Sequence, residues 1–286
     1  MNSAVRFRSI TLQEIAGAAE RLAQRSGAMA NVDWLAESEE LLDRLVAPSF
    51  VPQPMRVAPL PGSDRVVASP AVNDRLLQEV LRGRLDRHLE ETLPEGTHGY
   101  RAGRGVRSAG LALRDLLASG FTELLFTDIK AFFPSVDLSC LQRKLAEVFG
   151  SSLASIMVAL CRPKLVGKIP PGYTLTGLPL GQPLSPSLSN FYLCGVDRRL
   201  ESDCVAYVRY ADDIVLAAKE EDHLESALRM LKEELEKVGL SLNEGKTHPM
   251  RYEGRPISYL GHVVDEQRIY ERVSPQKLAE TMAKRG

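Results

Sequence analysis

Two adjacent acidic residues, Asp212 and Asp213, stand between two short apolar segments of the chain. The segments AYVRY (206–210) and IVLAA (214–218) have the composition of buried strands, and the short interval between them leaves room only for a tight turn. The sequence therefore predicts a hairpin with the acids at its tip. An acidic pair in a turn is often ordinary turn chemistry. Two like charges gain nothing from that position unless a cation is present, so the pair also predicts a divalent cation site.

A third carboxylate, Asp128, stands at the end of another apolar segment, 121–127, which reads as a buried strand. A strand end holds a side chain out of the core and near solvent. Carboxylates gathered in this way are the hard oxygen ligands that suit Mg²⁺, which takes a few acids together with substrate phosphate oxygens.

The rest of the chain mixes helices with short strands, which predicts an α+β fold. Apolar residues at helical spacing predict two helices within 10–46, and further helices over 71–91, 107–118, 138–149, 151–161, 187–200 and 222–239. A hairpin is expected at 55–69 around the Pro61-Gly62-Ser63-Asp64 turn, and another with strands over 257–264 and 268–273. The segment 163–187 is rich in Pro and Gly.

Composition limits the class of protein. The chain has 286 residues, of which 44% are hydrophobic and 26% charged, as in a soluble globular protein. Its longest apolar run, 154–161, is far short of the ~20 residues of a membrane span, and the N-terminus lacks an apolar signal core. We therefore expect a cytoplasmic protein without a membrane partner. Four scattered cysteines match neither a disulfide framework nor a metal clip.

The net charge of −1 does not by itself indicate a nucleic-acid-binding protein. The charge is unevenly distributed, because residues 130–199 carry eight Lys and Arg against three Asp and Glu. Such a basic region binds a polyanion by releasing its counterions. A solvated basic face explains the same charge equally well.

Six segments in register give a more specific indication. Tyr210-Ala211-Asp212-Asp213 resembles the YADD signature of reverse transcriptases. TDIKAFFPSV (127–136), LPLGQPLSPSLSN (178–190), GLSLNEGKT (239–247) and SYLGHVV (258–264) resemble the other palm motifs and the primer grip, in the order of that family. RVAPLPGSDRVVASPAVNDRLLQ (56–78) and HGYRAGRG (98–105) are similar to the finger motifs of group II intron-like enzymes. The resemblance covers roughly residues 55–275.

This resemblance implies a right-hand polymerase fold with helical fingers and an antiparallel palm sheet. The expected domains are N-terminal helices and fingers over 1–120, a first part of the palm over 121–137, a fingers insertion over 138–176 and a second part of the palm over 177–275. Residues 276–286 would then be a linker or the start of a thumb that is largely absent.

The family resemblance also implies roles for the acids. Asp128 and Asp212 would hold two Mg²⁺ ions, for which Mn²⁺ is a substitute, with the Ile129 carbonyl completing one coordination shell. Asp213 would be a supporting carboxylate whose direct ligation stays open. Lys246 resembles the palm lysine that protonates departing pyrophosphate.

The incoming nucleotide is expected to contact a second set of residues. Phe133 lies where the family places an aromatic ring that excludes a 2′-hydroxyl, and a core phenylalanine is the alternative. Arg56 and Arg65 resemble the pair that clamps the triphosphate, because a guanidinium fork matches phosphate oxygens. In the second palm motif, which contains Gly181 and Gln182, most relatives carry glutamine where this chain has Leu180. Looser nucleotide discrimination, as in the diversity-generating branch, is the hypothesis that follows.

Template and primer contacts complete the expected site. Arg101 and Arg104, in a glycine-rich loop, are expected to contact the template backbone. The primer is expected to lie against Tyr259, Leu260 and Gly261 of the primer-grip motif.

The resulting interpretation is an RNA-directed DNA polymerase that extends a DNA or RNA primer on an RNA template with deoxynucleotide triphosphates and Mg²⁺. The finger motifs favour a group II intron-like or CRISPR-associated enzyme, which would have a thumb-supplying or CRISPR-adaptation protein as partner. An anti-phage defence or diversity-generating reverse transcriptase, an RNA-templated RNA polymerase, and a non-catalytic RNA-binding polymerase remnant are the alternatives. Three mutually repelling acids in one place argue against the remnant.

Overall fold

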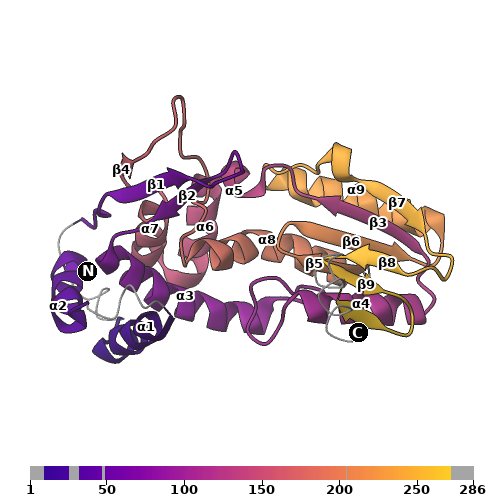
Figure 1. Ribbon diagram of the computed structural model, residues 1–286, viewed down its shortest axis with the longest axis horizontal. Coiled ribbons are helices and arrows are strands. Elements are labelled where there is room, and N and C mark those ends of the chain that lie inside the picture. Colours follow the sequence, from indigo (N-terminus) through magenta and orange to yellow (C-terminus); the bar gives the residue numbers. More distant parts are fainter. Residues whose placement is uncertain (1–9, 26–31, 47–48, 204, 272–286) are drawn as a thin grey trace, which may run out of the picture. The chain divides into compact units, whose positions relative to one another are not determined.

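The structure is a computed structural model that describes residues 10–25, 32–46, 49–203 and 205–271 (Figure 1). The described chain divides into two compact units. Unit 1 comprises residues up to 92, together with 131–193 and 238–240. Unit 2 comprises residues 93–130 and 194–237, and the chain from 241 onwards.

Helices make up most of unit 1. They are α1 (Leu12–Arg25), α2 (Trp34–Val46), α3 (Val72–Thr92), the short α5 (Phe132–Ser135), α6 (Leu138–Phe149), α7 (Ser151–Ala159) and the first half of α8 (Ser185–Ser202). Helices α1 and α2 both pack against α3, and α6 packs against α7. Asp137 accepts hydrogen bonds from the Ser139 and Cys140 amides, so it caps the N-terminus of α6.

A three-stranded sheet completes unit 1. Strands β1 (Met55–Pro59) and β2 (Val66–Ser69) form the expected antiparallel hairpin, and β4 (Leu165–Gly167) pairs with β1 in parallel. Their buried residues Met55, Val57 and Ala68 form a small core of their own. The strand β4 was not expected, because three residues between prolines are too few to show an alternating pattern.

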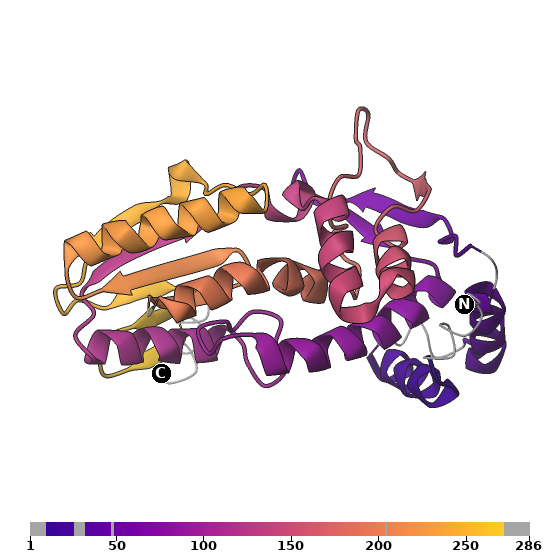
Figure 2. The same cartoon turned by 180° about the vertical axis from the view of Figure 1, so that it is seen from behind.

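Unit 2 is built on a four-stranded antiparallel sheet in the order β5-β6-β3-β7 (Figures 1 and 2). Its strands are β3 (Glu123–Asp128), β5 (Ala206–Tyr210), β6 (Asp213–Ala218) and β7 (His248–Arg251). The helices of this unit are α4 (Val106–Ala118), α9 (Glu221–Lys237) and the second half of α8, with a 3-10 turn at Glu244–Lys246. The hairpin of β5 and β6 confirms the expectation of two strands joined by a tight turn over 206–218.

Both faces of this sheet are covered, which agrees with the run of consecutive buried residues in β6. Helix α4 packs against β5, and α9 packs against β6 and β3. Leu124 and Phe126 of β3 lie opposite Ala217 and Val215 of β6 in the register, so these four side chains share one face of the sheet. That face and α4 form one core cluster, in which Leu113, Val208 and Val264 are completely buried.

The end of the described chain forms a second, smaller antiparallel sheet rather than one hairpin. Strand β8 (Ile257–Tyr259) turns at Leu260-Gly261 into β9 (His262–Val264), which then pairs with β10 (Ile269–Glu271). Leu260 and Gly261 both have positive φ angles, of 47° and 77°, as a two-residue hairpin turn of type I′ requires. The expectation of one continuous strand over 257–264 was wrong because leucine rarely marks such a turn.

The α+β class predicted from the sequence is confirmed. Helix α4 and the segment 93–130 belong to unit 2, and 177–193 belongs to unit 1. The expected limits of the fingers and the palm, at 120, 137 and 176, stay a prediction. The expected linker or thumb start at 276–286 lies outside the described residues. None of the helices in the described ranges has the length and apolar character needed to cross a membrane.

Candidate active site

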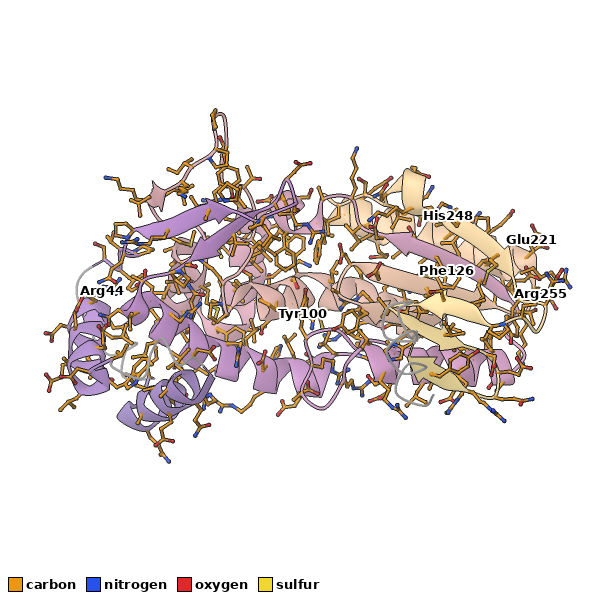
Figure 3. All side chains as sticks on the ribbon, viewed as in Figure 1. Arg44, Tyr100, Phe126, Glu221, His248 and Arg255 are labelled. Carbon is orange, nitrogen blue, oxygen red and sulfur yellow. The ribbon has the colours of Figure 1, made fainter. Side chains whose placement is uncertain are left out.

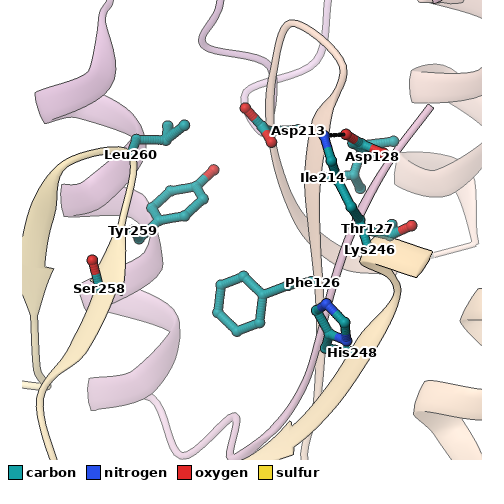
Figure 4. A pocket seen from close by; sticks show the side chains of 10 residues that line it. All are labelled: Phe126, Thr127, Asp128, Asp213, Ile214, Lys246, His248, Ser258, Tyr259 and Leu260. Carbon is teal, nitrogen blue, oxygen red and sulfur yellow. Dashed lines mark hydrogen bonds and ion pairs between the residues drawn. The ribbon is translucent and has the colours of Figure 1, made fainter. Parts of the chain in front are cut away.

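The three predicted acids come together at one end of the unit 2 sheet. Asp128 ends β3 and lies directly opposite Asp213, which begins β6. The Ile129 amide donates a hydrogen bond of 3.3 Å to the Asp212 carbonyl, which fixes the strand end beside the hairpin turn. Because opposite residues of an antiparallel pair point to the same face, Asp128 and Asp213 share one side of the sheet. Figure 4 shows both side chains at the same cavity.

The turn that carries Asp212 has an unusual backbone. Ala211, at its first position, has φ +58°, a left-handed conformation that costs a residue with a side chain about 1–2 kcal/mol. The loop at 98–105 lies directly against this turn, because a Cβ on Gly99 would stand 2.3 Å from the Ala211 nitrogen. Glycine at 99 is therefore required by the close approach of two backbones.

A second segment borders the acids. The Lys130 amide donates to the Ser241 carbonyl at 2.9 Å, and the Asn243 amide donates to the Asp128 carbonyl at 2.8 Å. The Thr127 and Thr247 hydroxyls are hydrogen bonded at 2.8 Å. These contacts hold the 3-10 turn at Glu244–Lys246 over the end of β3. In consequence, the Lys246 ammonium donates a hydrogen bond to Oδ2 of Asp128 (Figure 4).

The electrostatics of the site are those of crowded acids. Asp128 is 6% exposed, and its Oδ1 is buried without a hydrogen-bond partner among the described residues. Loss of solvent raises the pKa of Asp213, and the neighbouring charges of Asp212 and Asp128 raise it further. The hydrogen bond to Asp128 raises the pKa of Lys246, so this side chain is a stable cation at neutral pH.

A cavity of about 260 Å³ opens beside the acids. Its walls come from β3, β6, the 3-10 turn, β7 and the β8–β9 hairpin (Figure 4). The lining residues are Phe126, Thr127, Asp128, Asp213, Ile214, Lys246, His248, Ser258, Tyr259 and Leu260. The Tyr259 ring is buried, and its hydroxyl has no hydrogen-bond partner within the described chain. Burial and the charge of Asp213 raise the pKa of Tyr259, so its hydroxyl stays protonated. Leu260 and Gly261 form the turn at this cavity's rim.

The donor set suits Mg²⁺, although the described residues contain no group of three His, Cys, Asp or Glu side chains already arranged to hold a metal ion. Oδ1 of Asp128 is a hard oxygen ligand that has no hydrogen-bond partner among the described residues. Mg²⁺ keeps several waters and uses only one or two carboxylates together with substrate phosphates. The residues present therefore fit a cation that binds together with its substrate.

The residues expected to contact the triphosphate lie in unit 1. Arg56 and Arg65 are both exposed on the β1–β2 hairpin, where Arg56 lies opposite Ser69 and the Leu60 amide donates to the Arg65 carbonyl at 2.8 Å. Gly181, with φ +94°, crosses the same hairpin so closely that a Cβ would stand 2.6 Å from Cγ1 of Val67. The hairpin and the second palm motif are thus one local structure.

The other nucleotide-site residues of unit 1 are less exposed. Phe133 is half-buried and packs edge-on against the buried Phe132, while its carbonyl accepts from the Leu178 amide at 2.8 Å. Leu180 is half-buried, and its carbonyl accepts from the Ala68 amide at 2.7 Å. Gln182 is buried and donates to the Leu160 carbonyl at 3.2 Å, so its side chain is hydrogen bonded within the core of unit 1.

The two arginines of the glycine-rich loop in unit 2, for both of which template contact is expected, differ in exposure. Arg101 is buried and donates to the carbonyls of Pro94 and Thr97 at 2.8 and 3.1 Å. It closes its own loop because buried carbonyls need donors. Arg104 pairs with Glu95 at 2.5 Å and is partly exposed. Burial lowers the pKa of His98 to about 4, and its neutral ring contacts the Ser108 hydroxyl.

Sequence reasoning missed one polar pair of this unit. Arg209 and Asp197 are both at least 98% buried, and the guanidinium forms a bidentate ion pair with the carboxylate at 2.5 and 2.7 Å. Its remaining nitrogen donates to the Ala211 carbonyl at 2.8 Å. The charged Arg209 inside the otherwise apolar segment AYVRY is the signal that could have indicated this pair, because a buried arginine needs a partner.

Two acids lie at adjacent ends of antiparallel strands, a lysine is hydrogen bonded to one of them, and a hairpin borders the same cavity. This arrangement matches the one expected for the palm of a polymerase. The family model of the reverse transcriptase (RNA-dependent DNA polymerase) matches residues 51–264. The chain therefore belongs to the reverse transcriptase family.

Curated relatives agree over a shorter region. Protein P of orangutan hepatitis B virus is 38% identical over 90 residues, and Protein P of woolly monkey hepatitis B virus is 37% identical over 90 residues. Each match covers 30% of this chain and 10% of the viral protein. The chain thus matches about a tenth of the length of these relatives.

Solved structures share the fold. Telomerase from Candida albicans, in complex with a fragment of telomeric RNA, superimposes with a TM-score of 0.57 at 15% identity, over 77% of this chain and 45% of that chain. A telomerase from Candida tropicalis truncated from its C-terminal domain gives a TM-score of 0.56 at 14% identity, over 83% and 60%. The fingers and palm fold expected from the sequence is confirmed by this likeness.

Proposed function

We propose that this protein is an RNA-directed DNA polymerase that extends a primer on an RNA template. The observation that carries the proposal is the pairing of Asp128 with Asp213 across β3 and β6, with the Asp212 carbonyl bound to the Ile129 amide. The family match and the crowding of three acids support it. A polymerase remnant has no physical reason to retain an unpartnered, buried carboxylate oxygen.

Asp128 and Asp212, with the Ile129 carbonyl, would hold two Mg²⁺ ions, and Asp213 would support them. Bound Mg²⁺ lowers the pKa of a primer 3′-hydroxyl and neutralises charge on the transferred phosphate. Asp128 and Asp212 orient the reacting groups in line, because both are fixed to neighbouring strand ends. Lys246 lies within hydrogen-bond reach of Asp128 and donates its proton to the departing pyrophosphate.

The incoming deoxynucleotide is proposed to bind against unit 1. Arg56 and Arg65 are exposed on the β1–β2 hairpin, where guanidinium groups bind a triphosphate bidentately. Phe133 excludes a 2′-hydroxyl, which its half-buried, ring-packed position supports by limiting its freedom. Leu180 stands beside Gly181 and cannot donate the hydrogen bonds of an amide, so discrimination at insertion is loose.

Template and primer contacts are proposed for unit 2. Arg104 is partly exposed in the glycine-rich loop and contacts the template backbone. The β8–β9 hairpin supports the primer through Tyr259, Leu260 and Gly261, because its turn forms part of the cavity wall beside Asp213. The unpartnered Tyr259 hydroxyl is a donor that a primer phosphate or sugar satisfies.

The branch of the family is proposed from the sequence. The segments 56–78 and 98–105 resemble finger motifs of group II intron-like enzymes, which favours an intron-associated or CRISPR-associated role over an anti-phage or diversity-generating one. Sequencing the RNA that copurifies with the protein, together with its genomic neighbours, distinguishes an intron RNA or CRISPR-adaptation genes from a variable-repeat pair.

A primer-extension matrix tests the activity. A labelled primer is annealed to RNA and to DNA templates and supplied with deoxynucleotides or ribonucleotides, with and without Mg²⁺. Extension on RNA with deoxynucleotides and Mg²⁺ is expected, and Asp212→Ala is expected to abolish it while template binding is retained. Extension by Asp212→Ala at the wild-type rate, or extension by neither protein under any condition, contradicts the proposal.

A further inference from the structure

The turn that carries Asp212 is held by the buried ion pair between Arg209 and Asp197. Arg209 occupies β5, and Asp197 lies on α8 within the same unit. The guanidinium uses Nε and Nη2 for the two oxygens of Asp197, at 2.7 and 2.5 Å. Its Nη1 donates to the Ala211 carbonyl at 2.8 Å. One rigid, planar group therefore joins α8 to the turn.

The backbone of Arg209 is fixed as well as its side chain. Its amide donates to the Gly96 carbonyl at 2.8 Å, and its carbonyl accepts from the His98 amide at 2.8 Å. The next glycine, Gly99, approaches Ala211 so closely that a Cβ would stand 2.3 Å from the Ala211 nitrogen. Ala211 is thus held between the guanidinium, which binds its carbonyl, and the backbone of the 96–99 segment.

This arrangement matters because the Ala211 conformation is intrinsically unfavourable. A φ of +58° in a residue with a Cβ persists only when the surrounding structure imposes it. A relaxed turn would move Asp212, the next residue, away from the end of β3. Buried ion pairs can often be replaced by well-packed apolar residues without loss of stability, so stability alone does not explain why this pair is present.

We propose that Arg209, anchored by Asp197, is a positioning residue that imposes the turn geometry of Ala211 and so places Asp212 beside Asp128. This inference rests on the proposed polymerase function. It predicts that a change at Arg209 slows the chemical step and weakens cation binding, while the nucleotide affinity at saturating Mg²⁺, which we assign to contacts with unit 1, stays unchanged. If the ion pair were purely structural, a change at Arg209 would lower the stability of the fold and leave kcat and cation binding unchanged.

Two variants separate these roles. Arg209→Lys keeps the buried positive charge. An ammonium group, however, cannot make the two parallel hydrogen bonds to Asp197 and also donate to the Ala211 carbonyl. The double variant Arg209→Met with Asp197→Leu replaces the pair by apolar side chains and leaves no buried charge unpaired. Arg44→Lys is the matched control, because Arg44 (Figure 3) pairs with the buried Asp74, and both belong to unit 1 and not to the unit that contains the turn.

The experiment measures single-nucleotide incorporation against Mg²⁺ and nucleotide concentration, Mn²⁺ binding by electron paramagnetic resonance, and thermal unfolding. We expect both variants to remain folded and to lose roughly 100-fold in kcat with an unchanged nucleotide KM, because small misplacements of reacting groups have that effect. Mn²⁺ binding is expected to weaken, and Arg44→Lys to behave as wild type.

Several results would overturn the inference. One is a kcat and a Mn²⁺ affinity within twofold of wild type in folded variants, and another is failure of both variants to fold, which would assign the pair to the fold alone. If wild type itself does not extend a primer, the proposed polymerase function fails. The Mn²⁺ measurement then still decides whether Arg209 positions the acids.

Discussion

Asp128 and Asp213 lie directly opposite each other on neighbouring antiparallel strands, with Lys246 bound to one of them. Like charges placed opposite one another destabilise a sheet. Lys246 relieves part of the repulsion, but Oδ1 of Asp128 and the raised pKa of Asp213 show that the relief is incomplete. The site is therefore prepared for additional positive charge.

Added Mg²⁺ should stabilise this protein. A cation that binds the folded site and not the unfolded chain raises stability by mass action. We expect the unfolding temperature of wild type to rise by about 2–4 °C for each ~1 kcal/mol of binding free energy, and to fall again with EDTA. Asp128→Asn with Asp212→Asn should remove most of this response in differential scanning calorimetry. An equal Mg²⁺ response in that variant would show that the cation binds elsewhere.

Replacing Phe133 should relax the choice of sugar. Phe133→Val opens space beside the expected position of the 2′-carbon, so ribonucleotide incorporation should rise by roughly 10- to 100-fold relative to deoxynucleotide incorporation. Competition between the two nucleotide sets on one template measures the ratio. Phe132→Leu is the control, since the buried Phe132 should affect stability and leave the ratio unchanged.

Restoring an amide at position 180 should tighten discrimination. Leu180→Gln adds donors and an acceptor next to Gly181, where the backbone already contacts the β1–β2 hairpin. We expect fewer misinsertions in the variant, because a hydrogen-bonding site rejects a misplaced base more strongly than an aliphatic one. Sequencing of products from both proteins gives the two error spectra. Indistinguishable spectra would remove any role of Leu180 in fidelity.

The N-terminal helix should be attached in a pH-dependent way. A bidentate hydrogen bond from Arg84 lowers the pKa of Glu14 to about 2, against an ordinary value of 4.5. A lowered pKa means that the pair stabilises the folded state above pH 4.5 and that this contribution is lost as the pH falls toward 2. Glu14→Gln should therefore cost about 1–2 kcal/mol at pH 7 and almost nothing at pH 2.

Urea unfolding at the two pH values measures that difference. Glu20→Gln, which removes an exposed acid from the same helix, should have no comparable effect at either pH. A constant cost of Glu14→Gln at all pH values would contradict the ion-pair explanation.

The periodic spacing of apolar residues predicted most of the secondary structure. Helices α3, α4, α6, α7 and α9 and the β1–β2 and β5–β6 hairpins follow the expected segments closely, because their apolar spacing is regular. Strands β4 and β7 were missed. Three or four residues do not establish a period, and β7 is formed by its pairing with β3 instead of by its own composition.

Local patterns predicted which acids come together better than they predicted the surroundings of those acids. Asp128 and Asp213 were identified because each stands at the end of an apolar strand. Burial of Gln182 depends on a distant segment, which supplies the Leu160 carbonyl. Arg101 instead turns back onto the Pro94 and Thr97 carbonyls of its own loop, and the glycine-rich composition of that loop does not indicate this. The partner of Arg209 likewise could not be predicted, because Asp197 lies on a separate helix. The arginine inside an apolar strand indicates only that some partner is needed.

The most direct test of the central claim is the rate of single-nucleotide incorporation on an RNA template by Asp128→Asn. Asparagine keeps the size of the side chain and removes the charge opposite Asp213. Glu225→Gln, which neutralises an exposed acid of α9 in the same unit, is the control. We predict Mg²⁺-dependent incorporation by wild type and Glu225→Gln and no detectable incorporation by a folded Asp128→Asn that still binds template. Incorporation by Asp128→Asn at the wild-type rate would contradict the account.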